Sequence, residues 1–420
     1  MSKDINDEII DETIDETTNG TTNDGNSKNK NKDKDKDKDK DKDKDKDKDK
    51  EEETIRDDDM DDGGDTSGNT DDGSVDNGNS GNNGNNNKYD DKKDKKAKKV
   101  KVDKEQKKII KNEFKRYKDL ETIEIPEGIT EIGDKAFKGC DSLKDVTLPD
   151  GITELGESVF KQCSSIESIV IPEGVTEIKK SAFSKCTKLS SITLPSTLVN
   201  IEDHAFEGCE SLVEITIPEG VTHIGDQAFL NCEQLETVTL PSKLTSLENR
   251  VFEGCCSLKS IEIPSGVESI GTAVFSDCSQ LESVKLNEGL KSIGLYAFSG
   301  CVHLKSIDIP SSANDIQACA FMNCGFESIT IPEGITRIND GTFSGCVDLT
   351  NIELPSTLEA IGSQVFWCCR SLEQLYIPDG VTYIGRSSFD DCDYLDEVSV
   401  PTNAGIENEE QYEDIDFIRR

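Results

Sequence analysis

Residues 120–142 read LETIEIPEGITEIGDKAFKGCDS, and residues 143–165 repeat the pattern as LKDVTLPDGITELGESVFKQCSS. The pattern runs through twelve units of 23 residues, one of them shortened to 22, and a half unit that starts at Leu395. All 12 prolines of the chain occupy the seventh position of a unit. A fixed period of this length is typical of a solenoid, in which each repeat packs only on its neighbours.

Each unit carries its apolar residues at fixed places. Leu120, Ile123 and Ile125 hold positions one, four and six of the first unit, so the last two lie on the same side of a strand. Proline at position seven ends the strand, because it lacks the N–H that a strand ladder needs. Residues 134–140 then predict one helical or 3-10 turn that buries a phenylalanine and a cysteine.

One such coil cannot bury its own apolar side chains, whereas stacked coils bury them in continuous ladders. The sequence therefore predicts a leucine-rich repeat solenoid, that is, a curved parallel β-solenoid with short helical or 3-10 turns. At a strand spacing of about 4.8 Å, the twelve units would extend for roughly 58 Å. We place this domain at residues 120–400.

The consensus LxxIxIPxGVTxIGxxAFxxC, which residues 120–394 follow almost unit by unit, resembles the BspA-like, or Treponema-type, leucine-rich repeat family. The resemblance implies a curved parallel β-solenoid that is used for binding, and it supplies no catalytic residue. Proteins of this family are often surface or secreted adhesive proteins of bacteria. The resemblance therefore adds an adhesin to the functions considered below.

Units eight and nine depart from the consensus. Asn287 replaces the proline of unit eight, Ala313 replaces a larger apolar residue of unit nine, and unit nine is one residue short after Cys324. Each change removes a feature that the other units share. We expect these two units to be the weakest or most bent part of the solenoid.

The N-terminal segment differs sharply from the repeats. Only eight apolar residues occur in residues 1–87, and residues 33–50 are nine consecutive Asp-Lys pairs. A segment of this composition cannot bury enough apolar surface to offset its chain entropy, so we predict a disordered low-complexity tail. Its aspartate clusters do not fit the glycine and glutamate positions of an EF-hand loop.

Two further segments flank the repeats. Residues 88–119 are predicted to be a basic linker and capping helix, because residues 88–118 carry 15 basic against six acidic residues. The helix would span residues 103–118, where Asp103 and Gln106 are spaced as in a capping box and the apolar residues fall near helical spacing. Residues 401–420 are predicted to be an acidic C-terminal cap or tail. The residues expected to cover the last repeat are Ile406, Tyr412, Ile415 and Phe417.

The residues that most often carry chemistry fit structural roles here. Twelve of the 15 cysteines hold position 21 of the repeat, three residues after the phenylalanine, which predicts buried free thiols, with disulfides if the chain is exported. No zinc-type pair such as CxxC is present, and the three histidines occupy three different repeat positions. No nucleophile motif or phosphate loop occurs either. We therefore predict no enzymatic activity and no cofactor.

The outward positions of the first strand form the predicted binding surface, on the concave face of the solenoid. They are small, rich in hydroxyls and acidic, although threonine also suits a solvated strand. Tyr376 is the one aromatic residue at position five and is the predicted anchor. The candidate partner-binding residues are Glu124, Thr147, Thr193, Thr216, Thr239, Glu262, Lys285, Asp308, Thr330, Glu353 and Tyr376.

These features favour a protein-binding scaffold or adaptor. The alternatives are a cell-surface or secreted adhesin and a nuclear factor directed by the basic segment. The net charge of −38 favours a cationic protein partner and disfavours nucleic acid, except through residues 88–118. We expect no membrane insertion, because no apolar run approaches the roughly 18 residues of a membrane-spanning helix. The start MSKDINDEII lacks a signal pattern, which favours a cytoplasmic location over the nucleus or the cell surface. The oligomeric state and the identity of the partner stay open.

We predict that residues 1–87 contribute nothing to the folding of the repeats. A truncated chain that begins at Lys88 should keep the melting midpoint and the cooperativity of the full chain, because the removed segment holds only eight apolar residues. Circular dichroism during heating measures both quantities. A clearly lower midpoint would contradict the prediction.

Overall fold

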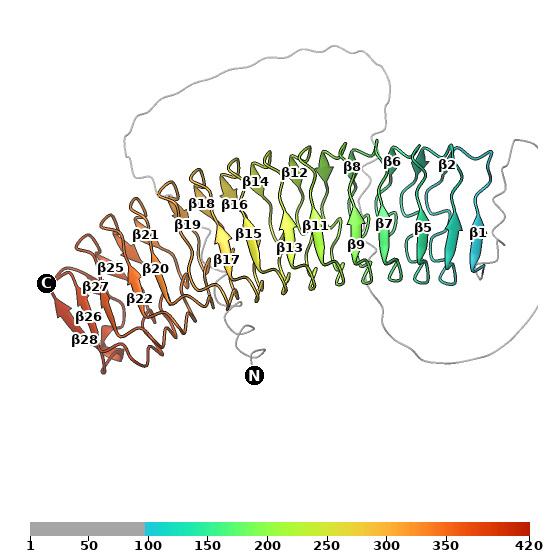
Figure 1. Ribbon diagram of the computed structural model, residues 1–420. Coiled ribbons are helices and arrows are strands. Elements are labelled where there is room, and N and C mark those ends of the chain that lie inside the picture. The colour runs from blue at the N-terminus through green and yellow to red at the C-terminus, as the bar shows by residue number, and fades with distance from the viewer. Residues whose placement is uncertain (1–96) are drawn as a thin grey trace, which may run out of the picture. The chain divides into compact units, whose positions relative to one another are not determined.

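The chain divides into two units, residues 1–85 and 86–420, and the computed structural model describes residues 97–420 of the second unit. These residues form a stack of coils that are joined by two rows of short parallel strands (Figure 1). The strands fall into nine short sheets, and within each sheet a strand pairs in register with its counterpart one coil further on, as Ile123 does with Val146. The predicted parallel β-solenoid is therefore confirmed.

The first row holds the strand that comes before the proline of each unit. Its strands are β1 (Lys99–Lys101), β3 (Thr122–Glu124), β5 (Asp145–Thr147), β7 (Ser168–Val170), β9 (Ser191–Thr193), β11 (Glu214–Thr216), β13 (Thr237–Thr239), β15 (Ser260–Glu262), β17 (Ser283–Lys285), β20 (Ser328–Thr330), β22 (Asn351–Glu353), β24 (Gln374–Tyr376), β26 (Glu397–Val400) and β28 (Asp416–Arg419).

The second row holds the short extended segment that follows the proline turn. Its strands are β2 (Lys108–Ile109), β4 (Glu131–Ile132), β6 (Glu154–Leu155), β8 (Glu177–Ile178), β10 (Asn200–Ile201), β12 (His223–Ile224), β14 (Ser246–Leu247), β16 (Ser269–Ile270), β18 (Ser292–Ile293), β19 (Asp315–Ile316), β21 (Arg337–Ile338), β23 (Ala360–Ile361), β25 (Tyr383–Ile384) and β27 (Gly405–Ile406). One 3-10 helix, η1 (Glu409–Gln411), is the only helix in the described part of the chain.

The turn that carries the phenylalanine is not a helix, so this part of the prediction is wrong. Its backbone N–H groups alternate between two kinds of partner. Those of Lys135, Phe137 and Gly139 donate to carbonyls of the next coil at 2.7–2.9 Å, whereas those of Ala136 and Lys138 donate three residues back at 3.2 Å. The positive φ of 56° at Lys135 turns the peptide toward the neighbouring coil. This third ladder of hydrogen bonds between coils replaces the bonds within a helix.

A continuous stack of phenylalanine rings fills the core on one side of the coil. Thirteen rings, from Phe114 to Phe389, lie 5.2–6.2 Å apart between centroids, with interplanar angles of at most 18°. Tyr117 closes the first end edge-on at 5.7 Å, and Tyr412 closes the last end at 5.6 Å. The in-register pairing of the strands imposes this alignment, because identical positions of successive coils must lie side by side.

The position-21 cysteines are free, and eleven of the twelve are fully buried, as predicted, while Cys392 is half-buried. Each thiol donates to the carbonyl of the phenylalanine in the preceding coil, as Cys163 Sγ does to Phe137 O at 3.1 Å. The same contact occurs in all twelve coils, at 3.0–3.3 Å. Cysteine therefore serves as a small hydrogen-bond donor as well as an apolar residue.

The segment before residue 120 is a coil of the solenoid and not a capping helix. β1 pairs with β3, β2 pairs with β4, and Phe114 stacks on Phe137. The apolar residues lie 23 positions before their equivalents in the first unit, and this spacing is the signal that a helical interpretation missed. Asp103 caps a turn through the N–H of Glu105 at 3.0 Å and does not start a helix. The solenoid thus begins one unit earlier than predicted.

Both strand rows are interrupted at the irregular units, because β17 does not pair with β20 and β19 does not pair with β21. Residues 305–309 of unit nine form no strand, so the first row breaks between β17 and β20, while β18 still pairs with β19 in the second row. Asn287 takes over the role of the missing proline turn by donating to Pro264 O and Val267 O at 2.9 Å. The missing residue of unit nine is accommodated at Gly325, where a Cβ would lie 2.1 Å from Val302 O. The expectation that these units are the least stable part of the solenoid stays a prediction.

Burial predicts very different reactivities for the cysteines. Desolvation raises the pKa of the Cys186 and Cys232 thiols to about 12, whereas Cys256 is exposed. Native reduced protein should therefore show one rapidly alkylated thiol, while denatured protein should show all 15. Mass spectrometry after iodoacetamide treatment counts both sets. The control variant Cys256→Ser should lose the rapid reaction, and several rapidly labelled native thiols would contradict the thiol ladder.

Candidate functional site

The first-row strands present the candidate binding surface. The outward side chains of these strands, at positions three and five of each repeat unit, are called the strand face below. All eleven predicted partner-binding residues are exposed. Ten of them belong to first-row strands, and Asp308 holds the equivalent position of the unit that has no first strand. The register places residues of neighbouring coils side by side, including Thr216 beside Thr239 and Thr330 beside Glu353. Asp308 lies in the unit that lacks the strand, so the face is interrupted there.

On five consecutive coils, the position-five side chains of the strand face have no side-chain partners in the described part of the chain. The position-five residues of these coils are called the threonine segment below, and they are Thr147, Val170, Thr193, Thr216 and Thr239. All five are exposed, and Val170 is 64% exposed. Within residues 97–420, the hydroxyls of the four threonines have no hydrogen-bond partner. The segment is therefore a flat row of small side chains, spaced by about 4.8 Å, that is free to make contacts outside the chain.

Charged members of the strand face pair with one another along the ladder. Glu262 accepts a bond from Lys285 at 2.5 Å, and Glu124 pairs with Lys101 at 2.6 Å. The hydrogen bond and the charge of Lys101 lower the pKa of the Glu124 carboxyl. All four side chains are more than half exposed, so solvent screening leaves these pairs little effect on stability.

Tyr376, the predicted anchor, already contacts the end of the chain. The Arg420 guanidinium lies over the tyrosine ring at 3.9 Å from the centroid, and Arg420 Nη1 donates to Tyr376 Oη at 2.8 Å. Arg420 also donates to Ser399 Oγ at 2.7 Å and bonds Asp379 and Ile377 O. The contact spans 44 residues and depends on the last coil, which is why the repeat pattern gave no sign of it.

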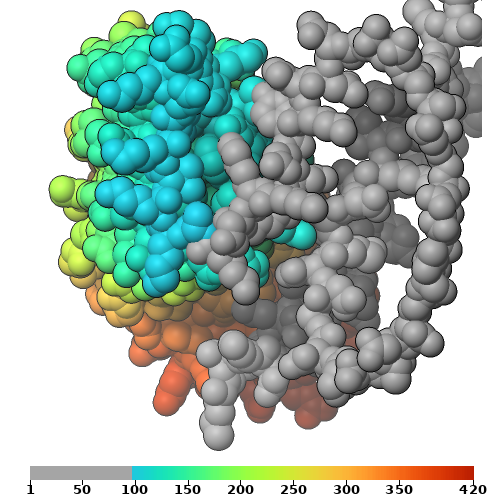
Figure 2. Space-filling model, turned by 90° about the vertical axis from the view of Figure 1, so that its right-hand side faces the viewer, coloured from blue at the N-terminus to red at the C-terminus, as the bar shows by residue number. Residues whose placement is uncertain are grey.

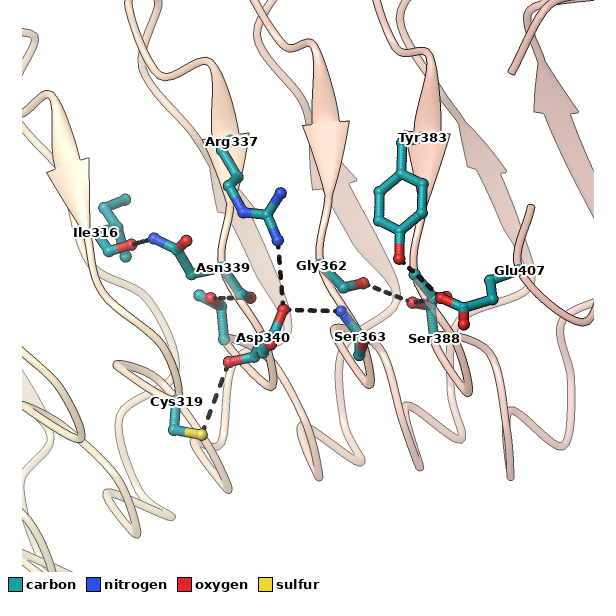
Figure 3. A network of polar contacts seen from close by, with 12 residues as sticks. Ile316, Cys319, Arg337, Asn339, Asp340, Gly362, Ser363, Tyr383, Ser388 and Glu407 are labelled. Atoms are coloured by element: carbon teal, nitrogen blue, oxygen red, sulfur yellow. Dashed lines mark hydrogen bonds and ion pairs between the residues drawn. The ribbon is translucent and has the colours of Figure 1, made fainter. Parts of the chain in front are cut away.

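The polar contacts near the C-terminal end connect coils instead of forming a reactive centre. Figure 3 shows Asp340 accepting the Ser363 N–H at 2.9 Å and Tyr383 donating to Glu407 at 2.7 Å. Ser388, which replaces the usual alanine beside the phenylalanine, donates to Gly362 O at 2.8 Å. Across residues 97–420, no three metal-ligating side chains converge, and no helix is long and apolar enough to cross a membrane.

Glutamate–serine pairs border the strand face at position eight of three pairs of neighbouring coils. Glu173 accepts the backbone N–H of Ser196 at 3.1 Å and its hydroxyl at 3.0 Å. Glu219 with Ser242 and Glu333 with Ser356 repeat this geometry. These bonds to the serine lower the pKa of all three carboxyls. Acidic side chains at this border therefore cap the turns of the following coil.

The repeat geometry can be compared directly with known families. The BspA type leucine-rich repeat region matches in six copies, over residues 92–213, 199–325 and 314–413. The chain belongs to this family. The first match reaches back across residues 97–119, in agreement with the additional N-terminal coil.

This BspA-type repeat protein is similar to several proteins whose structures have been solved. A leucine-rich repeat protein from Bacteroides ovatus is 31% identical, with a TM-score of 0.56 over 70% of this chain and 88% of that chain. A leucine rich cell surface protein from Faecalibacterium prausnitzii is 29% identical, with a TM-score of 0.46 over 76% of this chain and 90% of that chain. Comparison with curated proteins gave no match.

The glutamate–serine pairs predict a pH-dependent part of the stability. Because the pKa of each carboxyl is lowered on folding, its contribution is present above the unfolded pKa and is lost as pH falls through the folded pKa. The variant E173Q/E219Q/E333Q should be less stable than the natural chain at pH 7, and the difference should vanish in acid. Urea denaturation at several pH values measures this. The control Glu127→Gln, whose counterpart one coil on is Asp150, should show no such trend.

Proposed function

We propose that this BspA-type solenoid is a non-enzymatic scaffold that binds a protein partner through the threonine segment of its strand face. The supporting observation is that five consecutive coils present exposed side chains, and that the hydroxyls of the four threonines among them have no partner within residues 97–420. β-Branched side chains on a rigid ladder lose little rotamer freedom on binding. A preformed surface of this kind suits recognition of another folded surface.

The charge of the solenoid favours a cationic partner. Residues 120–420 contain 19 basic and 50 acidic residues, a net charge of −31. Asp145 and Glu214 lie at position three beside the threonine segment and are exposed. A negative field around a neutral contact row would speed the encounter with a basic surface, and the association rate would fall as salt rises.

The thiol ladder supports a reducing compartment, and we place the protein in the cytoplasm. Each position-21 thiol uses its proton in a hydrogen bond to a carbonyl, a role that a disulfide would remove. Many lysines of the basic segment bind acids of the next coil, which gives that segment a structural use besides nuclear import. Imaging of the tagged protein, combined with surface labelling of intact cells, separates the cytoplasmic, nuclear and adhesin alternatives.

The binding proposal predicts that one face of the solenoid is sensitive to substitution. A partner captured by the natural chain should bind the variant T193R/T216R/T239R at least about tenfold more weakly, because three bulky cations would occupy the contact row. The matched control T176R/T222R/T245R places the same change on exposed threonines before the second-row strands. Quantitative pull-down, with circular dichroism to confirm folding, measures the effect. If the control abolishes binding and the strand-face variant retains it, another face carries the function.

A further inference from the structure

Both ends of the described solenoid expose unpaired strands in both rows. β1 and β2 pair only toward the following coil, and β28 and β27 pair only toward the preceding one. Figure 2 looks onto the first of these ends, where the N-terminal coil faces the viewer. Edge strands carry unused N–H and C=O groups and can recruit another strand.

The first-row strands at the two ends match in register. Val398 of β26 pairs with Phe417 of β28, and Val100 of β1 pairs with Ile123 of β3, so Phe417 and Val100 hold the same place in their coils. Interior coils bond through alternate residues, as when Val102 N donates to Glu124 O at 3.2 Å. Continuing this pattern from β28 of one molecule to β1 of another sets Phe417 against Val100. β27 lies one coil before β28, because β27 pairs with β25 while β28 pairs with β26, so β2 would not meet β27 and only the first row would extend across the junction.

The two end coils carry opposite charge. Residues 97–119 contain ten basic and four acidic residues, a net charge of +6, and residues 395–420 contain eight acidic and two basic residues, a net charge of −6. The same register places the Asp416 carboxylate opposite the Lys99 ammonium across the junction. Neither side chain has an ion-pair partner within residues 97–420. The ends are therefore complementary in charge as well as in hydrogen bonding.

The inner side of the first coil already shows how such a junction is held. Five of its lysines pair with acids 23 residues further on, at 2.6–3.5 Å between nitrogen and oxygen. The pairs are Lys98–Glu121, Lys101–Glu124, Lys108–Glu131, Lys111–Asp134 and Lys118–Asp141. A basic coil stacked on an acidic coil is thus an arrangement that this sequence forms within the molecule.

We propose that the solenoid stacks head to tail with a second copy of itself, the acidic C-terminal coil of one molecule on the basic N-terminal coil of the next. The interface joins two different surfaces, so each added molecule leaves the same two ends free and the assembly grows without closing. Salt weakens it, because exposed ion pairs orient the ends.

The test uses the full chain in sedimentation velocity over a range of concentrations and salt. The natural chain should increase in mass with concentration at low salt and dissociate at high salt. K99E/K104E on the first coil and E413K/D416K on the last coil should each weaken association by more than about tenfold, because like charges then meet. The control K188E/K243E reverses exposed charges away from both ends and should leave association unchanged.

Mixing the two charge-reversed variants tests whether the two ends contact each other. K99E/K104E lowers the net charge of the first coil from +6 to +2 and sets a carboxylate opposite Asp416, and E413K/D416K changes the last coil from −6 to −2 and sets an ammonium opposite Lys99. In a mixture, the unchanged C-terminal coil of K99E/K104E faces the unchanged N-terminal coil of E413K/D416K, and the reverse junction again sets opposite charges against each other. Equimolar mixing should restore concentration-dependent growth. A monomer at all concentrations, a closed dimer of constant mass, or association that the end variants leave unchanged would overturn the proposal.

Discussion

In-register stacking of successive coils is the constraint on which the rest of the molecule depends. A single coil leaves most of its backbone N–H and C=O groups unpaired, and these are satisfied by the neighbouring coils at three places: the first strand, the second strand and the phenylalanine turn. Since each ladder requires the equivalent residue one coil away, every structural residue must recur at the same period. This requirement explains why proline, phenylalanine and cysteine recur at fixed positions of the repeat.

The cysteine position illustrates how strict the requirement is. Phe137 O accepts the Cys140 N–H at 3.1 Å within its own turn and the Cys163 thiol at 3.1 Å from the next coil. The second bond needs a donor short enough to fit beside the ring stack and apolar enough to be fully buried. Cysteine meets both conditions, and its raised pKa keeps the proton in place.

Three parallel ladders also make the stack tolerant of local defects. Unit nine loses its first strand and one residue, yet the ring stack continues across it, with Phe298, Phe321 and Phe343 at 5.7 and 5.8 Å. The surface is freer still, because outward positions do not contribute to the ladders. Charge can therefore vary along the solenoid, from a basic first coil to an acidic last coil, without changing the fold.

The sequence alone determined the period, the strand positions and the buried rows, because these depend on contacts between equivalent residues whose spacing is visible in the chain. It misjudged residues 103–118, since the apolar residues there satisfy a helical spacing as well as the 23-residue register, and only pairing with β3 and β4 distinguishes the two. It also could not decide turn against helix around Phe137, because the deciding hydrogen bonds go to the next coil. The contact of Arg420 with Tyr376 and the matching of the two ends were decided by the tertiary structure, since they depend on how the last coil folds back on its neighbours.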